Sequence, residues 1–301
     1  MATVINHVGE IVSRFDKGDV IDCDACGYKH VMPLPTTEQL KKFYEQEFYQ
    51  TEKSDYLETS AEDVEWKNIE FERRFQLAES KLDNVTKKVL DIGCGPGDFL
   101  AVGMERGWQV TGIEPSPVAA DYASKRNLSV IHGFFDQRIV ETLDTFDFIH
   151  MSEVLEHIPN PSELLDWAMQ LLSPGGVLCI SVPNDFSPIQ KVLTDTNEFE
   201  PWWVVPDHHL NYFDFDTLAA LIKKAGFELL ESTTNFPMEL FLLMGQNYTK
   251  DNKLGRELHQ RRKAFDITMS MYDPELLNRF YTSLAEAKMG RLAIQFARKP
   301  Q

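Results

Sequence analysis

The chain has 301 residues, of which 43% are hydrophobic, so it carries enough apolar material to fill a sizeable core. Its 47 acidic and 30 basic side chains give a formal net charge of −17. A surface this acidic repels nucleic-acid phosphates and anionic membranes, which argues against both as partners.

The sequence shows neither a membrane span nor a secretion signal. Its apolar runs are too short to cross a bilayer, and its N-terminus lacks the pattern of a signal peptide. Four cysteines in a chain of this length do not indicate a disulfide scaffold. We therefore expect a cytoplasmic protein.

The N-terminal residues contain half of a zinc-knuckle pattern. Cys23 and Cys26 are separated by two residues, and such a pair supplies two of the four ligands that a structural zinc ion needs. A second cysteine pair is absent, so His7 and His30 are the residues that would complete the site. The alternative is a degenerate knuckle with two structural thiols and no metal.

Two helices are predicted before the first core strand. One begins near Glu38, and the other spans residues 60–82, where Trp66 and other apolar side chains alternate with charges. We expect the second helix to pack over the core. Tyr49 and Tyr56 lie between the two helices and are candidates for a lid over the ligand site.

From residue 88 onward, short apolar strands alternate with amphipathic helices. This alternation predicts an α/β fold with a doubly wound parallel sheet, because parallel strands need long crossover connections. The predicted strands are residues 88–92, 109–113, 129–132, 146–151, 177–182, 227–232 and 292–299. The predicted helices are residues 98–106, 116–125, 160–172 and 215–225, with a turn at 173–176, an irregular segment at 183–206 and a mostly helical stretch at 236–290.

The first of these strands ends in a glycine-rich turn that contains Gly93, Gly95 and Gly97. Glycines at this position let a ligand approach the backbone N–H groups at the carboxyl edge of the sheet. A turn that binds a nicotinamide dinucleotide would carry its third glycine at position 98, where this chain has Asp98. The turn therefore favours a different nucleoside cofactor.

Two acidic residues near the turn indicate which cofactor this is. Glu114 ends the second strand, where a carboxylate can accept hydrogen bonds from both ribose hydroxyls of an adenosine. Asp91 lies where a carboxylate would meet the amino-acid end of S-adenosylmethionine. A turn without basic residues suits this phosphate-free cofactor.

Four motifs in this order resemble the class I S-adenosylmethionine-dependent methyltransferases. They are residues 89–97, Glu114 after residues 110–113, residues 146–149 with 153–158, and residues 172–176. The resemblance implies a seven-stranded Rossmann-like sheet whose last strand pair is antiparallel. It assigns Gly93, Gly95 and Gly97 to cofactor approach, Glu114 to the ribose, Phe134 to the neighbourhood of adenine, and Met151 to the cofactor edge.

The N-terminal cysteine pair, with Pro33 and Pro35, resembles a subgroup that has a small zinc-binding front domain. That subgroup includes deoxysugar C-methyltransferases and other small-molecule enzymes. We predict a knuckle-like and lid region over residues 1–60, a cofactor-binding core over 61–235, and a helical insertion with the last strand over 236–301. The insertion either covers the acceptor or forms a homodimer interface.

Candidate catalytic residues lie in the loops that follow the core strands. His157, His208 and His209 are placed to face the acceptor, and one of the latter two is interpreted as a metal-free general base. In the alternative mechanism, Glu153, Glu156, His157 and a later histidine hold a divalent cation that binds a vicinal diol. This Glu-x-x-Glu-His pattern resembles ubiquinone-pathway O-methyltransferases and small-RNA 2′-O-methyltransferases, and the acidic surface argues against RNA.

These observations predict O-methylation of a small polar acceptor. A sugar or sugar-nucleotide of polysaccharide or secondary metabolism is the first choice, and Trp202 and Trp203 are interpreted either as a stacking surface for it or as lid packing. C- or N-methylation of a small metabolite is the alternative within the same class. A non-catalytic cofactor-binding or scaffold protein is the alternative from another class.

Overall fold

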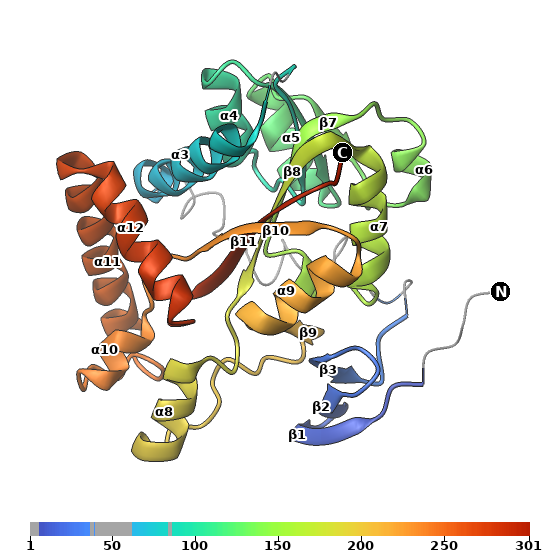
Figure 1. Cartoon of the computed structure of the whole chain (residues 1–301). Coiled ribbons are helices and arrows are strands. Elements are labelled where there is room, and N and C mark those ends of the chain that lie inside the picture. Colours follow the sequence, from blue (N-terminus) through green and yellow to red (C-terminus); the bar gives the residue numbers. More distant parts are fainter. Residues whose placement is uncertain (1–5, 37–38, 40–61, 84–85) are drawn as a thin grey trace.

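The computed structural model describes residues 6–36, 39, 62–83 and 86–301. Its centre is a seven-stranded sheet with helices on both faces, and a small antiparallel sheet lies beside it (Figure 1). The helix predicted from Glu38 and the lid candidates Tyr49 and Tyr56 lie outside the described residues.

The large sheet has the strand order β10-β11-β8-β7-β4-β5-β6. Neighbouring strands from β8 to β6 are parallel, whereas β11 is antiparallel to both β8 and β10. The predicted seven-stranded α/β fold with an antiparallel last pair is confirmed. The bounds are β4 Lys88–Ile92, β5 Gln109–Glu114, β6 Val130–His132, β7 Phe146–Ser152, β8 Leu172–Pro183, β10 Glu228–Thr233 and β11 Leu292–Arg298.

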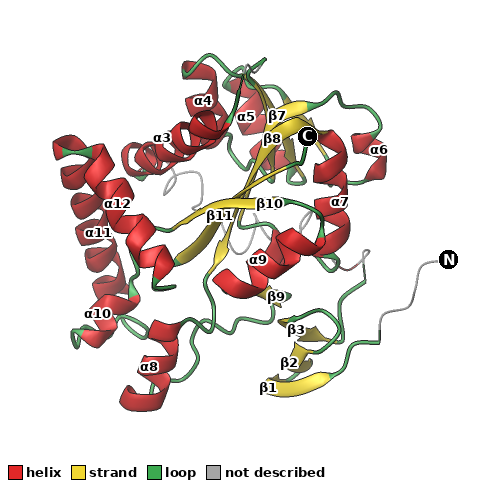
Figure 2. Cartoon of the chain, in the orientation of Figure 1, coloured by secondary structure: helices red, strands yellow, loops and turns green. Residues whose placement is uncertain are grey.

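The helices cover both faces of this sheet (Figure 2). All four helices predicted between residues 98 and 225 form within one residue of their predicted starts, and the stretch at 236–290 is mostly helical as predicted. The bounds are α3 Val64–Lys81, α4 Asp98–Glu105, α5 Pro117–Lys125, α6 Gln137–Val140, α7 Pro161–Leu171, α8 Pro188–Asn197, α9 Phe215–Lys224, α10 Glu239–Leu243, α11 Asn252–Tyr272 and α12 Pro274–Glu286.

The central strands are buried on both faces because helices cover each side. Successive side chains point to opposite faces, so Val89 and its neighbour Phe148 join one core cluster. Leu90 and its neighbour Ile149 join the other cluster. Helix α3 completes the first cluster with Phe75, whose ring stacks on a ring of α4.

Two local predictions were wrong. The segment at 183–206 is not irregular throughout, because α8 begins in it with a capping box between Ser187 and Gln190 and with Pro188 at the first helical position. The turn predicted at 173–176 is part of β8, which begins at Leu172 and pairs with β7 through an irregularity in register.

The small sheet joins the N-terminal residues to the core. It consists of β1 Gly9–Phe15, β2 Gly18–Cys23, β3 Tyr28–Met32 and the two-residue strand β9 Asn211–Tyr212, all antiparallel. Val20, Val31, Leu210 and Tyr212 form its buried core. The pairing of β3 with β9 fixes this sheet against the loops that follow the core strands.

Helices α11 and α12 form a layer beyond the sheet and contact α3 and β10 (Figure 1). Among the described residues, no helix has both the length and the apolar character needed to cross a bilayer. The two predicted domain boundaries, after residues 60 and 235, stay predictions.

Candidate cofactor and acceptor site

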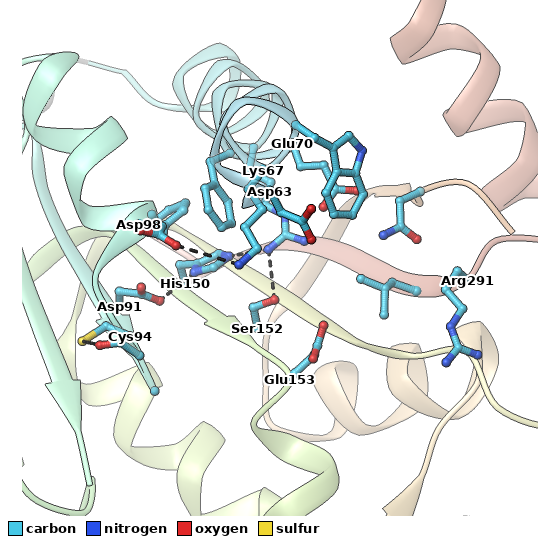
Figure 3. Close-up of a pocket in the computed structure, with 18 of the residues that line it drawn as sticks. Asp63, Lys67, Glu70, Asp91, Cys94, Asp98, His150, Ser152, Glu153 and Arg291 are labelled. Carbon is cyan, nitrogen blue, oxygen red and sulfur yellow. Dashed lines mark hydrogen bonds and ion pairs between the residues drawn. The ribbon is translucent and has the colours of Figure 1, made fainter. Parts of the chain in front are cut away.

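A cavity of about 540 Å³ opens at the carboxyl edge of β4 and β7. Its walls come from the glycine turn, the end of β7, helices α3 and α11, and the turn before β11. Figure 3 shows Asp91 and Cys94 at one end and Arg291 at the other, with Glu153 between them. A cavity of this size accommodates a nucleoside cofactor together with part of an acceptor.

The glycine turn forms one end of the cavity. Gly93 and Gly95 line it, and Gly93 has a φ of +74°, a conformation that favours glycine. A Cβ atom on Gly93 would lie 2.6 Å from Cγ2 of Val154, so this glycine also lets the turn pack against the loop after β7. Gly97 has a φ of +84°, and a Cβ atom there would lie 2.4 Å from Cδ1 of Leu128. Gly97 caps the start of α4, and its assignment to cofactor approach stays a prediction.

Glu114 holds the glycine turn in place. Its two carboxylate oxygens accept hydrogen bonds from the backbone N–H groups of Gly95 and Ser116, each at 2.8 Å. Phe134 is half-buried just after β6, and Met151 is fully buried in the main core cluster. The assignments of Glu114 to ribose, Phe134 to adenine and Met151 to the cofactor edge stay predictions.

A buried polar chain crosses the cavity wall. Arg74 Nη1 lies 2.8 Å from His150 Nε2, and His150 Nδ1 lies 2.7 Å from Asp91 Oδ1. Because arginine only donates, Nε2 accepts and the proton resides on Nδ1, which donates to Asp91. Burial lowers the pKa of His150, so the imidazole stays neutral. Phe99 stacks on this ring at a centroid distance of 3.8 Å.

Sequence reasoning missed Arg74 and His150. Arg74 lies on the same stripe of α3 as Trp66 and Glu70, at intervals of four residues, and all three line the cavity. The charge of Arg74 on the same helix stripe as the apolar Trp66 was the signal in the sequence that could have revealed it. His150 lies between apolar residues of a strand that is buried on both faces, where a polar side chain calls for a partner.

Helix α3 is more than a packing element. Trp66 is buried as expected, yet it lines the cavity, and its Nε1 donates to Asp266 Oδ2 at 2.6 Å. The guanidinium carbon of Arg262 lies 4.5 Å from the centroid of the Trp66 ring. His259 Nε2 lies 2.9 Å from a carboxylate oxygen of Asp63, which joins α11 to the start of α3. The helical insertion therefore covers part of the cavity.

Three of the predicted acidic and histidine residues converge, whereas Glu153 and His208, which were also predicted for the site, lie outside that group. Glu156, His157 and His209 place one ligand atom each within 4.8 Å of one another, and Glu156 is 1% exposed. Glu153 and His209 line the 540 Å³ cavity. His157 and His208 line a second cavity of about 310 Å³ beside β3. The structure thus turns His209, and not His208, toward the cofactor cavity.

Hydrogen bonds orient the members of this group. His157 Nδ1 donates to the carbonyl oxygen of His208 at 2.7 Å, which leaves Nε2 directed to Glu156 at 4.0 Å from Oε1. The Asn211 side chain donates to the carbonyl oxygens of Leu155 and Ile158, at 2.9 and 2.7 Å. Strand β9 therefore clamps the turn that carries Glu156 and His157.

Trp202 and Trp203 pack within the segment between α8 and β9. Trp203 is 6% exposed and contacts the ring of Phe186, while Trp202 packs in a cluster with Ile189 and Leu193. Trp66 is the tryptophan that lines the cavity. Of the two interpretations of the tryptophan pair, packing is the one that agrees with the structure.

The four candidate zinc ligands converge in the N-terminal sheet. His7, Cys23, Cys26 and His30 each place a ligand atom within 4.8 Å of the others. Burial raises the pKa of the Cys26 thiol to about 11. The sequence suggested His7 and His30 only as residues that would complete a zinc site. In the structure both lie next to Cys23 and Cys26.

Comparison with known proteins identifies the core. A family described as "Methyltransferase domain" matches residues 62–232. The chain is 39% identical over 109 residues to the ubiquinone biosynthesis O-methyltransferase of Actinobacillus pleuropneumoniae serotype 5b (strain L20), covering 33% of this chain and 46% of that protein. It is 31% identical over 166 residues to the enzyme of the same name from Xanthomonas axonopodis pv. citri (strain 306), covering 52% of this chain and 69% of that protein.

The chain spans less than two thirds of the length of the first curated relatives that it matches. Among solved structures it is similar to the plantazolicin methyltransferase BamL, with a TM-score of 0.56, 18% identity, and coverage of 87% of this chain and 94% of that one. At this identity the likeness shows the fold. Together with the family match over the core, it establishes that the chain belongs to the class I S-adenosylmethionine-dependent methyltransferases, with S-adenosylmethionine as the cofactor.

Proposed function

We propose that this protein transfers the methyl group of S-adenosylmethionine to an oxygen atom of a small polar acceptor. The observation that carries the proposal is one cavity that joins the glycine turn to Glu153 and His209. The relatives are named as O-methyltransferases, which supports oxygen as the methylated atom. C- or N-methylation is the competing outcome.

The cofactor end of the cavity fits the amino-acid part of S-adenosylmethionine. Arg74 and Asp91 both line the cavity and carry opposite charges, which suits a carboxylate and an ammonium group on one ligand. Gly93 and Gly95 leave room at the backbone. When bound, the cofactor supplies an electrophilic methyl group on a sulfonium, and the protein aligns the acceptor for in-line displacement.

We place activation of the acceptor at Glu156, His157 and His209. One carboxylate and two imidazoles suit a divalent cation. Because His209 lines the cavity, a cation held by this group would lie next to the bound acceptor. A bound cation would supply a Lewis acid that lowers the pKa of an acceptor hydroxyl. His209 also reaches the cavity without metal, so a metal-free general base is the alternative mechanism.

The lining of the far end favours a polar, anionic acceptor. Arg262, Arg291 and Asn235 line the cavity there, and Arg291 Nη1 lies 3.1 Å from Glu239 Oε1. Guanidinium groups recognise phosphate and carboxylate oxygens. A sugar or sugar-nucleotide therefore remains the acceptor that we propose, in preference to one with a long apolar chain. A homodimer and the absence of nucleic-acid partners stay predictions.

The first experiment measures cofactor binding and turnover separately. We expect S-adenosylhomocysteine to bind in calorimetry, and a panel of sugar nucleotides and catechols to yield a product that is heavier by one methyl group on oxygen. Methylation on nitrogen or carbon would contradict the oxygen assignment. Binding without turnover on the whole panel would favour a non-catalytic cofactor-binding protein.

The second experiment tests the activating group. His209→Ala should lower kcat about 100-fold with little change in S-adenosylhomocysteine affinity, whereas His208→Ala should have a smaller effect. Chelation should remove activity, and a divalent cation that accepts both imidazole and carboxylate ligands, such as Co²⁺ or Mn²⁺, should restore it. Activity that survives chelation but not His209→Ala would reject the cation and assign His209 as a metal-free base.

A further inference from the structure

The N-terminal sheet contains a cluster of two thiols and two imidazoles that the methyl-transfer site does not use. His7 precedes β1, Cys23 ends β2, Cys26 lies in the following turn, and His30 is in β3. Their four ligand atoms all lie within 4.8 Å of one another. Cys23 and His30 are each 1% exposed, so half of the cluster is shielded from water.

The three distances from His7 to the other ligand atoms are close to the edges of a tetrahedral site. His7 Nδ1 lies 3.1 Å from His30 Nε2, 3.4 Å from Cys26 Sγ and 3.7 Å from Cys23 Sγ. Zinc bonds of about 2.0 Å to nitrogen and 2.3 Å to sulfur imply tetrahedral edges of about 3.3 Å between nitrogens and about 3.5 Å between nitrogen and sulfur. The nitrogen–nitrogen distance is about 0.2 Å shorter than its edge, and the two nitrogen–sulfur distances lie on either side of theirs.

A backbone contact also orients one imidazole for metal binding. His30 Nδ1 lies 2.9 Å from the carbonyl oxygen of Val31 and donates to it. The proton is therefore on Nδ1, and the lone pair of Nε2 is directed to His7 and the two thiols. Hydrogen bonds of this kind fix the tautomer and ring orientation of histidines that bind metals.

We propose that His7, Cys23, Cys26 and His30 bind one structural zinc ion, and that this ion anchors strand β9 beneath the acceptor-side loop, residues 155–158. Two thiolates and two imidazoles form a closed donor set that zinc prefers. With four protein ligands, the ion keeps no open position for a substrate, so its role is to hold the chain.

The path from the ion to the acceptor-side loop is short. His30 pairs with Asn211 in the β3–β9 ladder, and Val31 N–H donates to the carbonyl oxygen of Leu210 at 2.8 Å. Leu210 N–H in turn donates to the carbonyl oxygen of Glu156 at 2.7 Å. The Asn211 side chain holds the same turn through its two carbonyl contacts. Loss of the ion should therefore loosen residues 155–158 and 208–212.

Metal content tests the first part of the proposal without any turnover. Full-length wild type purified with added zinc should hold about one zinc ion per chain. Cys23→Ser and His7→Ala should lose it, whereas Cys179→Ala and His132→Ala should keep it. His7→Cys should keep it as well, because a thiolate replaces the imidazole. Wild type reconstituted with Co²⁺ should show thiolate charge-transfer and tetrahedral d–d bands.

Wild type without stoichiometric metal and without these cobalt bands would overturn the site and leave a hydrogen-bonded cluster.

Hydrogen exchange tests whether the zinc ion anchors strand β9. Cys23→Ser, which leaves Glu156, His157 and His209 in place, should raise exchange at least tenfold over wild type in peptides covering 155–158 and 208–212. The peptide covering 88–97 should be unchanged. Equal acceleration everywhere would mean general destabilisation and would reject the anchoring role. Neither readout depends on the identity of the methyl acceptor.

Discussion

The two ends of the cavity are built in different ways. The cofactor end comes mainly from one contiguous segment, in which strand β4 supplies Asp91 and the glycine turn before α4 supplies Gly93 and Gly95. The acceptor end gathers side chains from distant segments, among them Trp66, His209 and Arg262. Backbone geometry determines the first end, and tertiary packing of side chains determines the second.

The largest effect is expected at the backbone of the cofactor end. Gly93→Ala combines a positive φ with a Cβ atom that would lie 2.6 Å from Val154, so the turn must shift. We expect affinity for S-adenosylhomocysteine to fall more than about 100-fold, as measured by calorimetry.

Gly107→Ala is the matched control for that change. Gly107 also has a positive φ, at +79°, but a Cβ atom there has open space around it. This variant should lose about 1 kcal/mol of stability from backbone strain and keep its cofactor affinity. Equal loss of affinity in both variants would show that strain, and not the close approach at the turn, governs binding.

The buried carboxyl of Asp185, which interacts electrostatically with Arg291, should give a pH-dependent stability. Burial raises the pKa of Asp185 from 3.8 to about 7. The folded chain then binds more protons than the unfolded chain between these values, so this group loses stability as pH rises through that window. Asp185→Asn should remove the loss, and its advantage over wild type should grow by about 2 kcal/mol from pH 5 to pH 7.

Urea unfolding at both pH values measures this difference. Comparison with wild type at each pH cancels the contributions of other groups, including the buried histidines. An advantage that is the same at pH 5 and pH 7 would contradict a raised pKa for Asp185.

A smaller effect is expected from the side chains that recognise the acceptor. Arg262→Met removes a guanidinium from the cavity wall while keeping much of its packing on Trp66. With an anionic acceptor, we expect KM to rise about tenfold with unchanged cofactor affinity. Arg261→Met is the control, because Arg261 is exposed and pairs with Glu257. Similar KM values for the two variants would show that Arg262 does not bind the acceptor.

The smallest effect concerns the hydrogen bond between α3 and α11. Trp66→Phe keeps most of the ring and deletes the donor to Asp266. We expect a loss of about 1–2 kcal/mol in stability and less than a threefold change in cofactor affinity. Thermal unfolding and calorimetry measure the two quantities. A large loss of cofactor affinity would show that the two ends of the cavity are coupled.

The sequence allowed most of the fold to be predicted because its signals are local. Alternation of strands and helices located the sheet, and Gly97 next to Asp98 located the start of α4. Asp91, Gly93 and Gly95 lie in the cavity for the same reason, since one turn carries them there.

The acceptor end was harder to predict because its residues meet only in the folded chain. Arg262 reaches the cavity from a helix whose other faces are polar as well, so its sequence surroundings do not distinguish it from Arg261. His208 and His209 are adjacent and equivalent in the sequence, and only the path of the chain before β9 separates them. The start of α8 was visible in Ser187 and Pro188, and reading the capping signals would have found it.

The pairing of β3 with β9 has a consequence for how the chain folds. His30 and its partner Asn211 are 181 residues apart in the sequence (211 − 30), so this contact carries a large loop-closure entropy. During synthesis, β3 emerges long before its partner and presents an open strand edge until residue 212 has left the ribosome. The N-terminal sheet should therefore be completed late, after the parallel core has formed its own strand pairs.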